Sequence, residues 1–339
     1  MRGTTGGVQR IGLLVAVVSV ALLSAGLALA RSKASPVGDG VVVINTNLAY
    51  EGDQAAGTGM VLTSSGEVLT NNHVISGATT VRVVVPGADR SYGARVVGYS
   101  VASDVAVLQL SGASNLKTVT AAAGKPVVGQ AVRAVGNAGG TGSLSTARGS
   151  ITGIGRTITA SDGSRAERLT GLIETNAALQ PGDSGGPLLD RSGRVVGMDT
   201  AAETSVGYGF QETAASDGYA IPIGRALAIA KLIVSGTSSA TVHIGATAFL
   251  GVQVTSAGYG YDVTGAAIAA VVPGGPADSA GLLPGDVITA VGGKTVSSPD
   301  ALTTMLLSKK PGAKLEVAFM DQTGASQNVV VTLGSGPPQ

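Results

Sequence analysis

Residues 182–188 read Gly-Asp-Ser-Gly-Gly-Pro-Leu, a glycine-rich turn that leads into a short apolar segment. A serine hydroxyl is a weak nucleophile near neutral pH and needs an adjacent base. The glycines permit a tight turn and a close approach of a substrate chain, and the turn can direct the amides of Gly182 and Ser184 at one developing oxyanion. Because the chain contains 52 glycines, an ordinary surface loop is the alternative interpretation, but the ordered string favours a nucleophilic serine.

Two histidines are available as the base. His73 ends an apolar run, and Asp104 directly precedes residues 105–110, which alternate as a strand does. In a serine triad the carboxylate orients the imidazole and stabilises its charged form. The sequence therefore predicts a catalytic triad of His73, Asp104 and Ser184. The other histidine, His243, lies between two domain-like stretches and is interpreted as a packing or linker residue.

The composition excludes several classes of function. A chain of 339 residues is long enough for two domains, and its cores must consist mainly of Val, Ile, Leu and Ala because aromatic residues make up only 3%. The net charge of +1 argues against a nucleic-acid partner, which requires clustered Lys and Arg. With no cysteine and two distant histidines, no metal-ligand spacing is present. We therefore predict no metal and no cofactor.

The amino-terminal segment, residues 1–30, has the pattern of an export signal. Arg2 and Arg10 precede an uninterrupted stretch of apolar or small residues, 11–30. This stretch ends in Ala-Leu-Ala, which resembles a signal-peptide cleavage site. A stretch of about 20 residues is also long enough to span a bilayer, so a cleaved signal peptide and a membrane anchor both remain open. Either alternative exports the rest of the chain, beginning with a spacer over residues 31–40.

The next part of the chain, from residue 41 to about 223, consists of short apolar segments broken by Gly, Ser, Asn and Asp. This pattern is typical of all-β barrels. Two barrels fit, with the histidine and aspartate on the first and the serine on the second, so that the active site lies between them. Residues 222–234 then change to helical spacing. We predict one domain over residues 41–234 and a linker over residues 235–246.

A second, smaller unit is predicted over residues 247–334. Residues 276–281 indicate a short helix, and Ser-Pro-Asp at 298–300 indicates the start of a longer helix with leucine and methionine side chains on one face. Two alternating segments near the end of the unit predict a hairpin. Residues 335–339 are predicted to be a frayed tail.

These motifs resemble those of a known family. The contexts of the three catalytic residues match trypsin-like serine proteases, and residues 70–75 and 175–188 resemble the HtrA/Deg branch in particular. The string Ala-Gly-Leu-Leu-Pro-Gly-Asp-Val-Ile at 280–288 resembles a bacterial PDZ domain. The resemblance implies a mainly β fold, a trypsin-like double β-barrel followed by a smaller α+β PDZ domain. That branch usually has asparagine at the position of Asp183, and we expect Asp183 to contribute only its backbone.

The resemblance also implies further site residues. The hydroxyl of Thr200 would support the triad carboxylate, Ala201 and Ala202 would edge the primary specificity pocket, and Ala178 would lie at its base. An alanine there favours small or medium apolar residues before the cleaved bond. Asp217 would lie near the far wall of the pocket, and it would admit basic residues if its side chain points inward.

By the same resemblance, the chain is an exported serine endopeptidase of the cell envelope that cleaves unfolded or exposed protein segments. The amides of Phe249, Leu250, Gly251 and Val252 would bind the terminal carboxylate of a peptide, which adds as a strand beside the long helix. A non-cleaving PDZ peptide-binding module or holdase is the alternative. Relatives are often homotrimers joined through aromatic residues, but this segment offers only Tyr50, so the oligomeric state stays open.

Overall fold

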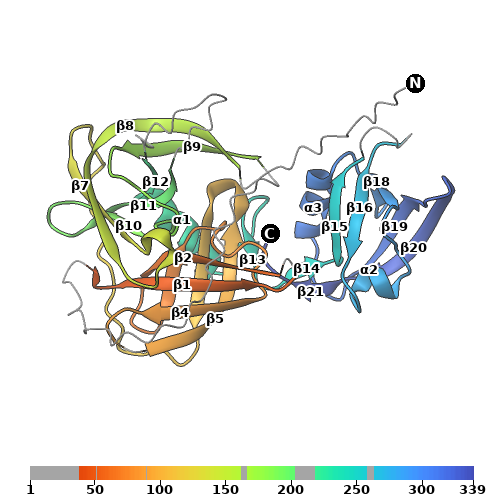
Figure 1. Ribbon diagram of the computed structural model, residues 1–339, viewed down its shortest axis with the longest axis horizontal. Helices are drawn as coiled ribbons and strands as arrows, with labels where there is room; N and C mark the ends of the chain where they lie inside the picture. The colour runs from red at the N-terminus through yellow and green to blue at the C-terminus, as the bar shows by residue number, and fades with distance from the viewer. Residues whose placement is uncertain (1–37, 51, 89, 162–165, 203–217, 258–262) are drawn as a thin grey trace, which may run out of the picture.

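The computed structural model describes residues 38–50, 52–88, 90–161, 166–202, 218–257 and 263–339. Within them, strands form two barrels that lie side by side, and a smaller unit of strands and helices follows at the other end of the molecule (Figure 1). The predicted mainly β fold class, a double barrel followed by an α+β unit, is confirmed.

Short strands rich in valine build the first barrel. They are β1 (Val41–Leu48), β2 (Asp53–Val61), β3 (Glu67–Thr70), β4 (Thr80–Val85), β5 (Arg90–Ser100) and β6 (Val105–Leu110). The sheet runs β5-β4-β1-β2-β3-β6, and the pairing of β5 with β6 closes it. Alternate side chains of these strands point inward, where residues such as Ile44, Val83 and Leu108 are fully buried.

The second barrel is closed in the order β10-β11-β12-β9-β8-β7. Its strands are β7 (Ala131–Gly136), β8 (Ser145–Ser161), β9 (Ala166–Thr175), β10 (Pro187–Leu189), β11 (Val195–Ala202) and β12 (Gly218–Pro222). The interior is packed with small and branched side chains, among them Ala134, Ile173 and Leu188. The segment that carries the nucleophile motif connects β9 to β10, at the side that faces the first barrel.

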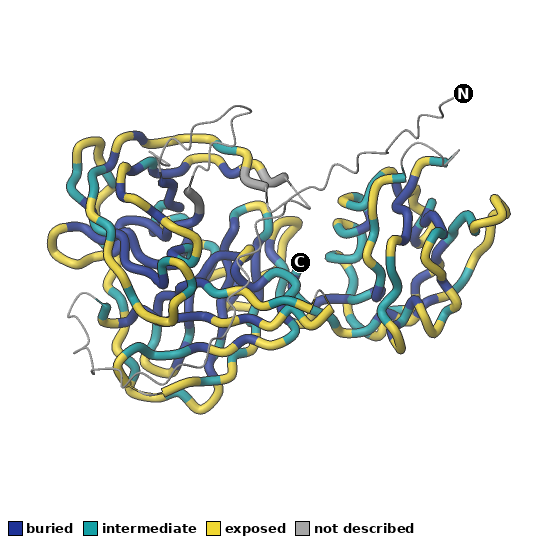
Figure 2. The backbone as a smooth tube through the Cα atoms, in the orientation of Figure 1, coloured by how far each residue is buried: buried dark blue, intermediate teal, exposed yellow. Residues whose placement is uncertain are grey.

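An apolar core joins the two barrels to each other. It combines Leu69 and Val107 of the first barrel with Met198 of the second, and Figure 2 shows buried backbone running through both barrels. Helix α1 (Ile223–Val234) closes this core with a stripe of buried residues at helical spacing, Ala226, Ala230 and Ile233. Gly236, at φ 72°, follows the helix end. The barrels therefore form one body, which fixes the residues of one against those of the other.

The smaller unit consists of a six-stranded sheet, a separate two-stranded sheet of its first and last strands, and two helices. Its strands are β14 (Thr247–Phe249), β15 (Val252–Ser256), β16 (Ala266–Val271), β17 (Val287–Val291), β18 (Lys294–Thr295), β19 (Lys314–Met320), β20 (Ser326–Thr332) and β21 (Gly334–Gly336), and its helices are α2 (Pro276–Ser279) and α3 (Pro299–Leu307). Ser298 caps α3 by accepting a hydrogen bond from the Ala301 amide. Leu302 on α3 is buried in the core of the unit, on the face that the sequence predicted.

The segment between the barrels and the smaller unit is more than a linker. Strand β13 (His243–Ile244) pairs with β5 and extends the first sheet. The His243 ring packs on the Tyr99 ring at a centroid distance of 5.0 Å, and burial followed by the charge of Lys310 lowers its pKa. These contacts favour the interpretation of His243 as a packing residue.

The prediction of a frayed tail is wrong. Strand β21 pairs with β14, and the chain end then returns to the first barrel, between the two units in Figure 1. Asn72 donates from Nδ2 to the Gln339 carbonyl at 2.9 Å, and the Gly77 amide donates to the Pro338 carbonyl at 2.9 Å. The sequence pattern missed these contacts because they join residues more than 200 positions apart.

The predicted export segment, residues 1–30, lies outside the described residues, as does Asp217. Among the helices that the structure describes, none is both long and apolar enough to cross a bilayer.

Candidate active site

His73 and Asp104 are held against each other in the first barrel. The His73 amide donates to Asp104 Oδ1 at 3.0 Å, and the ring Nδ1 lies 2.9 Å from Asp104 Oδ2. The carboxylate is buried, whereas the imidazole side chain is 40% exposed. Burial alone would raise the pKa of Asp104, but the charge of His73 and hydrogen bonds from His73 and Thr200 lower it overall. The carboxylate is thus ionised and oriented toward Nδ1.

The backbone at Asp104 is in a left-handed conformation, with φ 50° and ψ 49°, directly after the 3-10 turn η2 (Val101–Ser103). This conformation is costly for a residue with a side chain, although aspartate tolerates it better than most. Asn71 stabilises the bend by donating from Nδ2 to the Asp104 carbonyl at 2.9 Å. The bend lets the carboxylate reach His73 from just before the start of β6.

Ser184 lies on a turn that only glycine permits at two positions. Gly182 has φ 96°, and a Cβ there would lie 2.2 Å from the Asn137 carbonyl oxygen. Gly185 has φ 85°, and a Cβ there would lie 2.1 Å from the Thr58 carbonyl oxygen. The glycines of the motif therefore allow the second barrel to bring Ser184 directly against the first.

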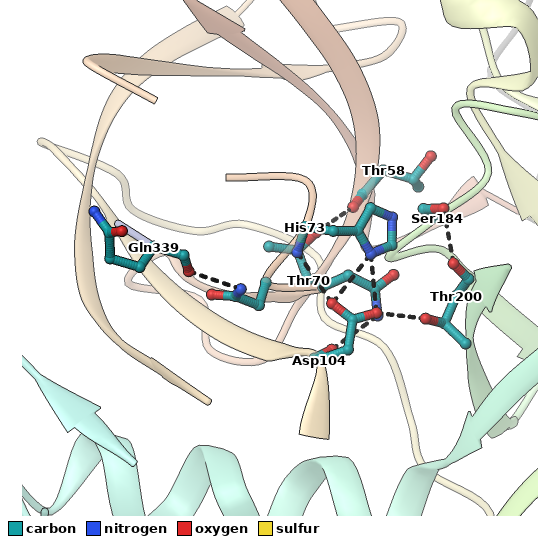
Figure 3. A network of polar contacts seen from close by, with 9 residues as sticks. Thr58, Thr70, His73, Asp104, Ser184, Thr200 and Gln339 are labelled. Atoms are coloured by element: carbon teal, nitrogen blue, oxygen red, sulfur yellow. Dashed lines mark hydrogen bonds and ion pairs between the residues drawn. The ribbon is translucent and has the colours of Figure 1, made fainter. Parts of the chain in front are cut away.

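Thr200, near the end of β11, links the serine to the carboxylate. Its hydroxyl donates to Asp104 Oδ2, and its carbonyl oxygen accepts a hydrogen bond from Ser184 Oγ at 3.3 Å. Figure 3 shows the His73 ring next to Asp104 and Ser184. Thr200 is hydrogen-bonded to both Asp104 and Ser184. The structure thus brings together the three predicted triad residues and the predicted support residue.

The backbone around Ser184 leaves two amides directed at one side of the turn. The carbonyl of Pro181 accepts from the Gly139 amide at 2.8 Å, so the Gly182 N–H of the same trans peptide points the opposite way. The Asp183 carbonyl accepts from the Gly186 amide at 2.9 Å, so the Ser184 N–H of that trans peptide points away from Gly186. The Ser184 carbonyl accepts from the Thr58 amide at 2.9 Å. Within the described residues, the Gly182 and Ser184 amides donate to no other protein group, which is the state an oxyanion site requires.

Thr58 on β2 is a site residue that sequence reasoning missed. Its hydroxyl donates to the Gly182 carbonyl at 2.6 Å and accepts from the Asn137 amide at 2.9 Å. Thr70 in turn donates from its hydroxyl to the Thr58 carbonyl at 2.7 Å. These bonds hold residues 182–184, which we call the oxyanion turn, to the first barrel. The sequence signal was weak, a threonine between two glycines, because its partners are far along the chain.

Asp183 contributes more than the backbone that the sequence analysis predicted. Its side chain is buried, and Oδ2 accepts a hydrogen bond from the Gln180 amide at 2.9 Å. Burial raises the pKa of Asp183, and the bond from Gln180 offsets this only in part. The side chain therefore ties together the two ends of the Gln180–Asp183 turn that precedes the nucleophile.

The predicted specificity residues lie near one another in the fold. Ala201 and Ala202 end β11, where they pair with Tyr219 and Gly218 of β12. Ala178 is exposed on the segment after β9. Its neighbour Leu179 packs against Gly218, where a Cβ would lie 2.7 Å from the leucine side chain. The backbone pairing of Ala202 with Gly218 and the packing of Leu179 on Gly218 bring the two segments together, and the specificity pocket itself stays a prediction.

The predicted carboxylate loop connects β14 to β15. Leu250 is buried, and Gly251 has φ 84°. The Phe249 ring stacks on Tyr50 of the β1–β2 connection, with centroids 5.2 Å apart and planes 13° apart. Among the described strands β15 pairs only with β16, and α3 contacts it on the other side. The strand edge beside α3 is therefore available for an added strand.

Comparisons with known proteins agree with this architecture. A family model described as a trypsin-like peptidase domain matches residues 57–198, and one described as a PDZ domain matches residues 248–333. The chain is 35% identical to the serine protease PepD of Mycobacterium tuberculosis over 89% of its length, and 31% identical to the periplasmic pH-dependent serine endoprotease DegQ of Escherichia coli over 83%. The solved structure of the HtrA-type protease AlgW with a tripeptide superposes with a TM-score of 0.50 at 28% identity, covering 89% of this chain and 95% of that one.

The chain spans 65% of the length of PepD and 59% of that of DegQ. Within that span it contains the peptidase domain and the PDZ domain in the same order as the sequence predicted. The chain therefore belongs to the HtrA/Deg family of trypsin-like serine proteases with a PDZ domain.

Proposed function

We propose that the chain is a serine endopeptidase that acts through an acyl-enzyme. The observation that carries this proposal is the connection through Thr200, which joins the Asp104–His73 pair to Ser184 across the two barrels. His73 accepts the proton of Ser184 as the hydroxyl attacks a peptide carbonyl, and then donates it to the leaving amine. Asp104 orients the ring and stabilises its charged form.

The oxyanion of the tetrahedral intermediate would lie against the amides of Gly182 and Ser184. Both amides lack a protein acceptor among the described residues, and the carbonyls on either side of them are held by Gly139 and Thr58. Donors fixed before the reaction stabilise the developing charge without reorganisation. The turn is therefore set for acyl transfer in this conformation.

We assign the protease unit to residues 41–234 and the PDZ unit to residues 247–334. A peptide carboxyl terminus would bind at the amides of residues 249–252 and add as a strand to β15. The alanines at 178, 201 and 202 favour small or medium apolar residues before the cleaved bond. Substrates would be unfolded or exposed segments of other proteins, since a peptide must be extended to enter the active site.

We place this activity outside the cytoplasm. The apolar segment 11–30 is an export signal or an anchor, and DegQ, a relative by sequence, is named as a periplasmic endoprotease. The Tyr50 ring stacks on Phe249 of the same chain and is still 44% exposed, so an oligomer contact through Tyr50 would not require the stack to break.

Cleavage of casein by the purified protein tests the proposal. The unchanged chain should degrade casein, and Ser184→Ala should lower the rate by about 10⁴-fold or more while circular dichroism shows a folded protein. Asp104→Asn should lower the rate to a similar degree because the imidazole takes the wrong tautomer. Equal cleavage by the unchanged chain and the Ser184→Ala variant would exclude Ser184 as the nucleophile. Binding of casein with no cleavage by any form would favour a holdase.

A further inference from the structure

Two carboxyl groups lie buried behind the nucleophile, outside the triad. Asp183 directly precedes Ser184, and Asp199 lies on β11 directly before Thr200. Their exposed fractions are 4% and 0%. Within the described part of the chain, Oδ1 of Asp183 and both carboxyl oxygens of Asp199 have no hydrogen-bond partner. Three unpartnered carboxyl oxygens inside a barrel are unusual, because a buried polar group without a partner is costly.

The two carboxyl groups belong to one site. The Asp199 backbone bonds both glycines after Ser184, accepting from the Gly185 amide and donating to the Gly186 carbonyl, each at 2.8 Å. The Asp183 side chain lies against β7, where a Cβ on Gly136 would be 2.5 Å from Oδ1. Burial, followed by the charge of Asp183, raises the pKa of Asp199. Both side chains therefore lie at the end of the second barrel beneath the oxyanion turn.

The surroundings of the pair are apolar. Strand alternation puts Asp199 on the same face of β11 as Gly197. A Cβ on Gly197 would lie 3.1 Å from Ala220 Cβ and from Ile173 Cδ1. These two residues belong to the core of the second barrel.

No described cation compensates the pair. On β7, Arg133 is on the opposite face from Ala134 and Gly136. On β9, Glu174 likewise faces away from the interior and is paired with Arg156 at 3.0 Å. Beyond β10, Asp190 is bonded to Arg194.

The remaining neighbours do not supply a positive charge either. Tyr219 of β12 packs in the core between the barrels, and Asp104 lies on the Thr200 side. The segment between β11 and β12, residues 203–217, contains no Lys, Arg or His in its sequence.

Two carboxylates cannot both keep their charge in such a site, since each would repel the other in a medium that solvates neither. Burial raises the pKa of Asp183, and burial together with the charge of Asp183 raises that of Asp199 well above its usual value. A proton held between the two groups removes one charge and gives at least two of the unpartnered oxygens a hydrogen bond. Carboxyl pairs of this kind titrate as a unit.

We propose that Asp183 and Asp199 share one proton in a carboxyl–carboxylate hydrogen bond that positions the oxyanion turn of Ser184. The proposal rests on the function proposed above for its effect on catalysis, although not for its effect on stability. Asp183 and Asp199 are positioning residues and do not contact substrate. At high pH the shared proton leaves, the two carboxylates repel, and the bond from the Gln180 amide to Asp183 transmits the movement to the turn. The kcat then falls while KM changes little.

Asparagine variants test the shared proton. Asp199→Asn and Asp183→Asn each replace one carboxyl with an amide that donates a hydrogen bond at every pH. Asp190→Asn is the matched control, because Asp190 lies in the same barrel but its carboxylate already accepts from the Ser192 and Arg194 amides and from the Arg194 side chain. Thermal unfolding and kcat are measured across pH for all four proteins.

The sign of the stability effect follows from the raised pKa values. A raised native pKa contributes its stability below the unfolded value of 3.8, and that stability is lost as pH rises toward the native value. An asparagine does not incur this loss. Relative to the unchanged protein, the Tm of Asp199→Asn should therefore be higher by about 2–4 °C or more near pH 8, and the gain should shrink toward pH 4. Asp190→Asn should show no such gain, because the lowered pKa of Asp190 means that its carboxylate stabilises the fold above the unfolded value of 3.8.

Activity and infrared absorption give two further readouts. The unchanged protein should lose kcat on the alkaline side, and in Asp199→Asn the ratio of alkaline to neutral kcat should no longer fall, whatever the absolute kcat of the variant. The C=O stretch of a neutral buried carboxyl should be present at neutral pH, should vanish at alkaline pH, and should be absent from Asp199→Asn. The infrared measurement on the unchanged protein stands even if a variant does not fold.

Failure of this proposal and failure of the protease assignment are distinguishable. A Tm difference that is independent of pH, together with no neutral carboxyl band, would overturn the shared proton whether or not the protein cleaves casein. Stability that depends on added Na⁺ or Ca²⁺ in place of pH would assign the pair to a cation and would also overturn it. A pH-dependent Tm gain in a protein without cleavage would support the shared proton and remove only its catalytic consequence.

Discussion

Replacing Thr58 with valine should disconnect the oxyanion turn from the first barrel. The substitution keeps the branched shape but removes the hydroxyl that donates to the Gly182 carbonyl and accepts from the Asn137 amide. Each buried group left without a partner costs about 1–3 kcal/mol, so two groups cost about 2–4 kcal/mol after some relaxation. For a unit of this size the Tm should fall by roughly 4–16 °C.

The same substitution should lower catalysis through kcat. A displacement of the oxyanion donors by a fraction of an ångström to 1 Å corresponds to a loss of about 10- to 100-fold. The assay compares kcat and KM on a short chromogenic peptide for the unchanged protein, Thr58→Val and Thr58→Ser, and Thr58→Ser should keep most of the activity because it retains the hydroxyl. A Thr58→Val protein with unchanged kcat and unchanged Tm would refute the assignment of Thr58 as the support of the turn.

Three other predictions concern the neighbouring groups. Thr200→Val removes the hydroxyl from Asp104 Oδ2 and should reduce kcat about tenfold in the same peptide assay; an unchanged kcat would contradict the role of that bond. Because the pKa of Asp104 is lowered, its stabilisation is present above the unfolded value of 3.8 and is lost as pH falls through the lower native value. The Tm gap between the unchanged protein and Asp104→Asn should therefore be full at neutral pH and close in acid, and a gap that widens in acid would be the opposite result. Tyr50→Ala removes a stack worth about 0.5–1.5 kcal/mol and should increase amide exchange over residues 247–257, whereas unchanged exchange would show that the stack does not restrain the carboxylate loop.

Short contiguous motifs carried most of what the sequence could predict. The context of Ser184 predicted a turn of unusual backbone conformation, and the structure has positive φ at the glycines on either side. The short apolar segments from residue 41 onward predicted strands, and the helical spacing of residues 222–234 predicted α1, which begins at residue 223. These features depend on neighbours in the chain, so a single sequence is enough to reveal them.

Contacts between distant segments could not be predicted in the same way. Thr58 bonds Gly182 across 124 positions, and nothing in the residues around Thr58 marks it as part of the site. The tail was predicted to fray, but Asn72 and Gly77 supply partners for it from the first barrel. Asp199 passed unnoticed because one buried acid in a strand becomes informative only when Asp183 is placed beside it.

The departure at Asp183 illustrates the limit of reasoning from a resemblance. The resemblance identified an aspartate where relatives usually have asparagine, and the sequence analysis expected Asp183 to contribute only its backbone. The structure has a second buried carboxyl, Asp199, whose pKa is raised by burial and by the charge of Asp183, and this is the basis of the shared proton that we propose. The physical consequence was visible only once both side chains had positions.

Covalent labelling by a fluorophosphonate tests the central claim most directly, because the reagent reacts with a serine that an adjacent base activates. Peptide mass spectrometry of the labelled protein should place a single adduct on Ser184, and His73→Ala should slow the labelling by about 10³-fold or more. Labelling at another residue, or equal labelling rates for the unchanged protein and His73→Ala, would contradict a nucleophilic Ser184 activated by His73.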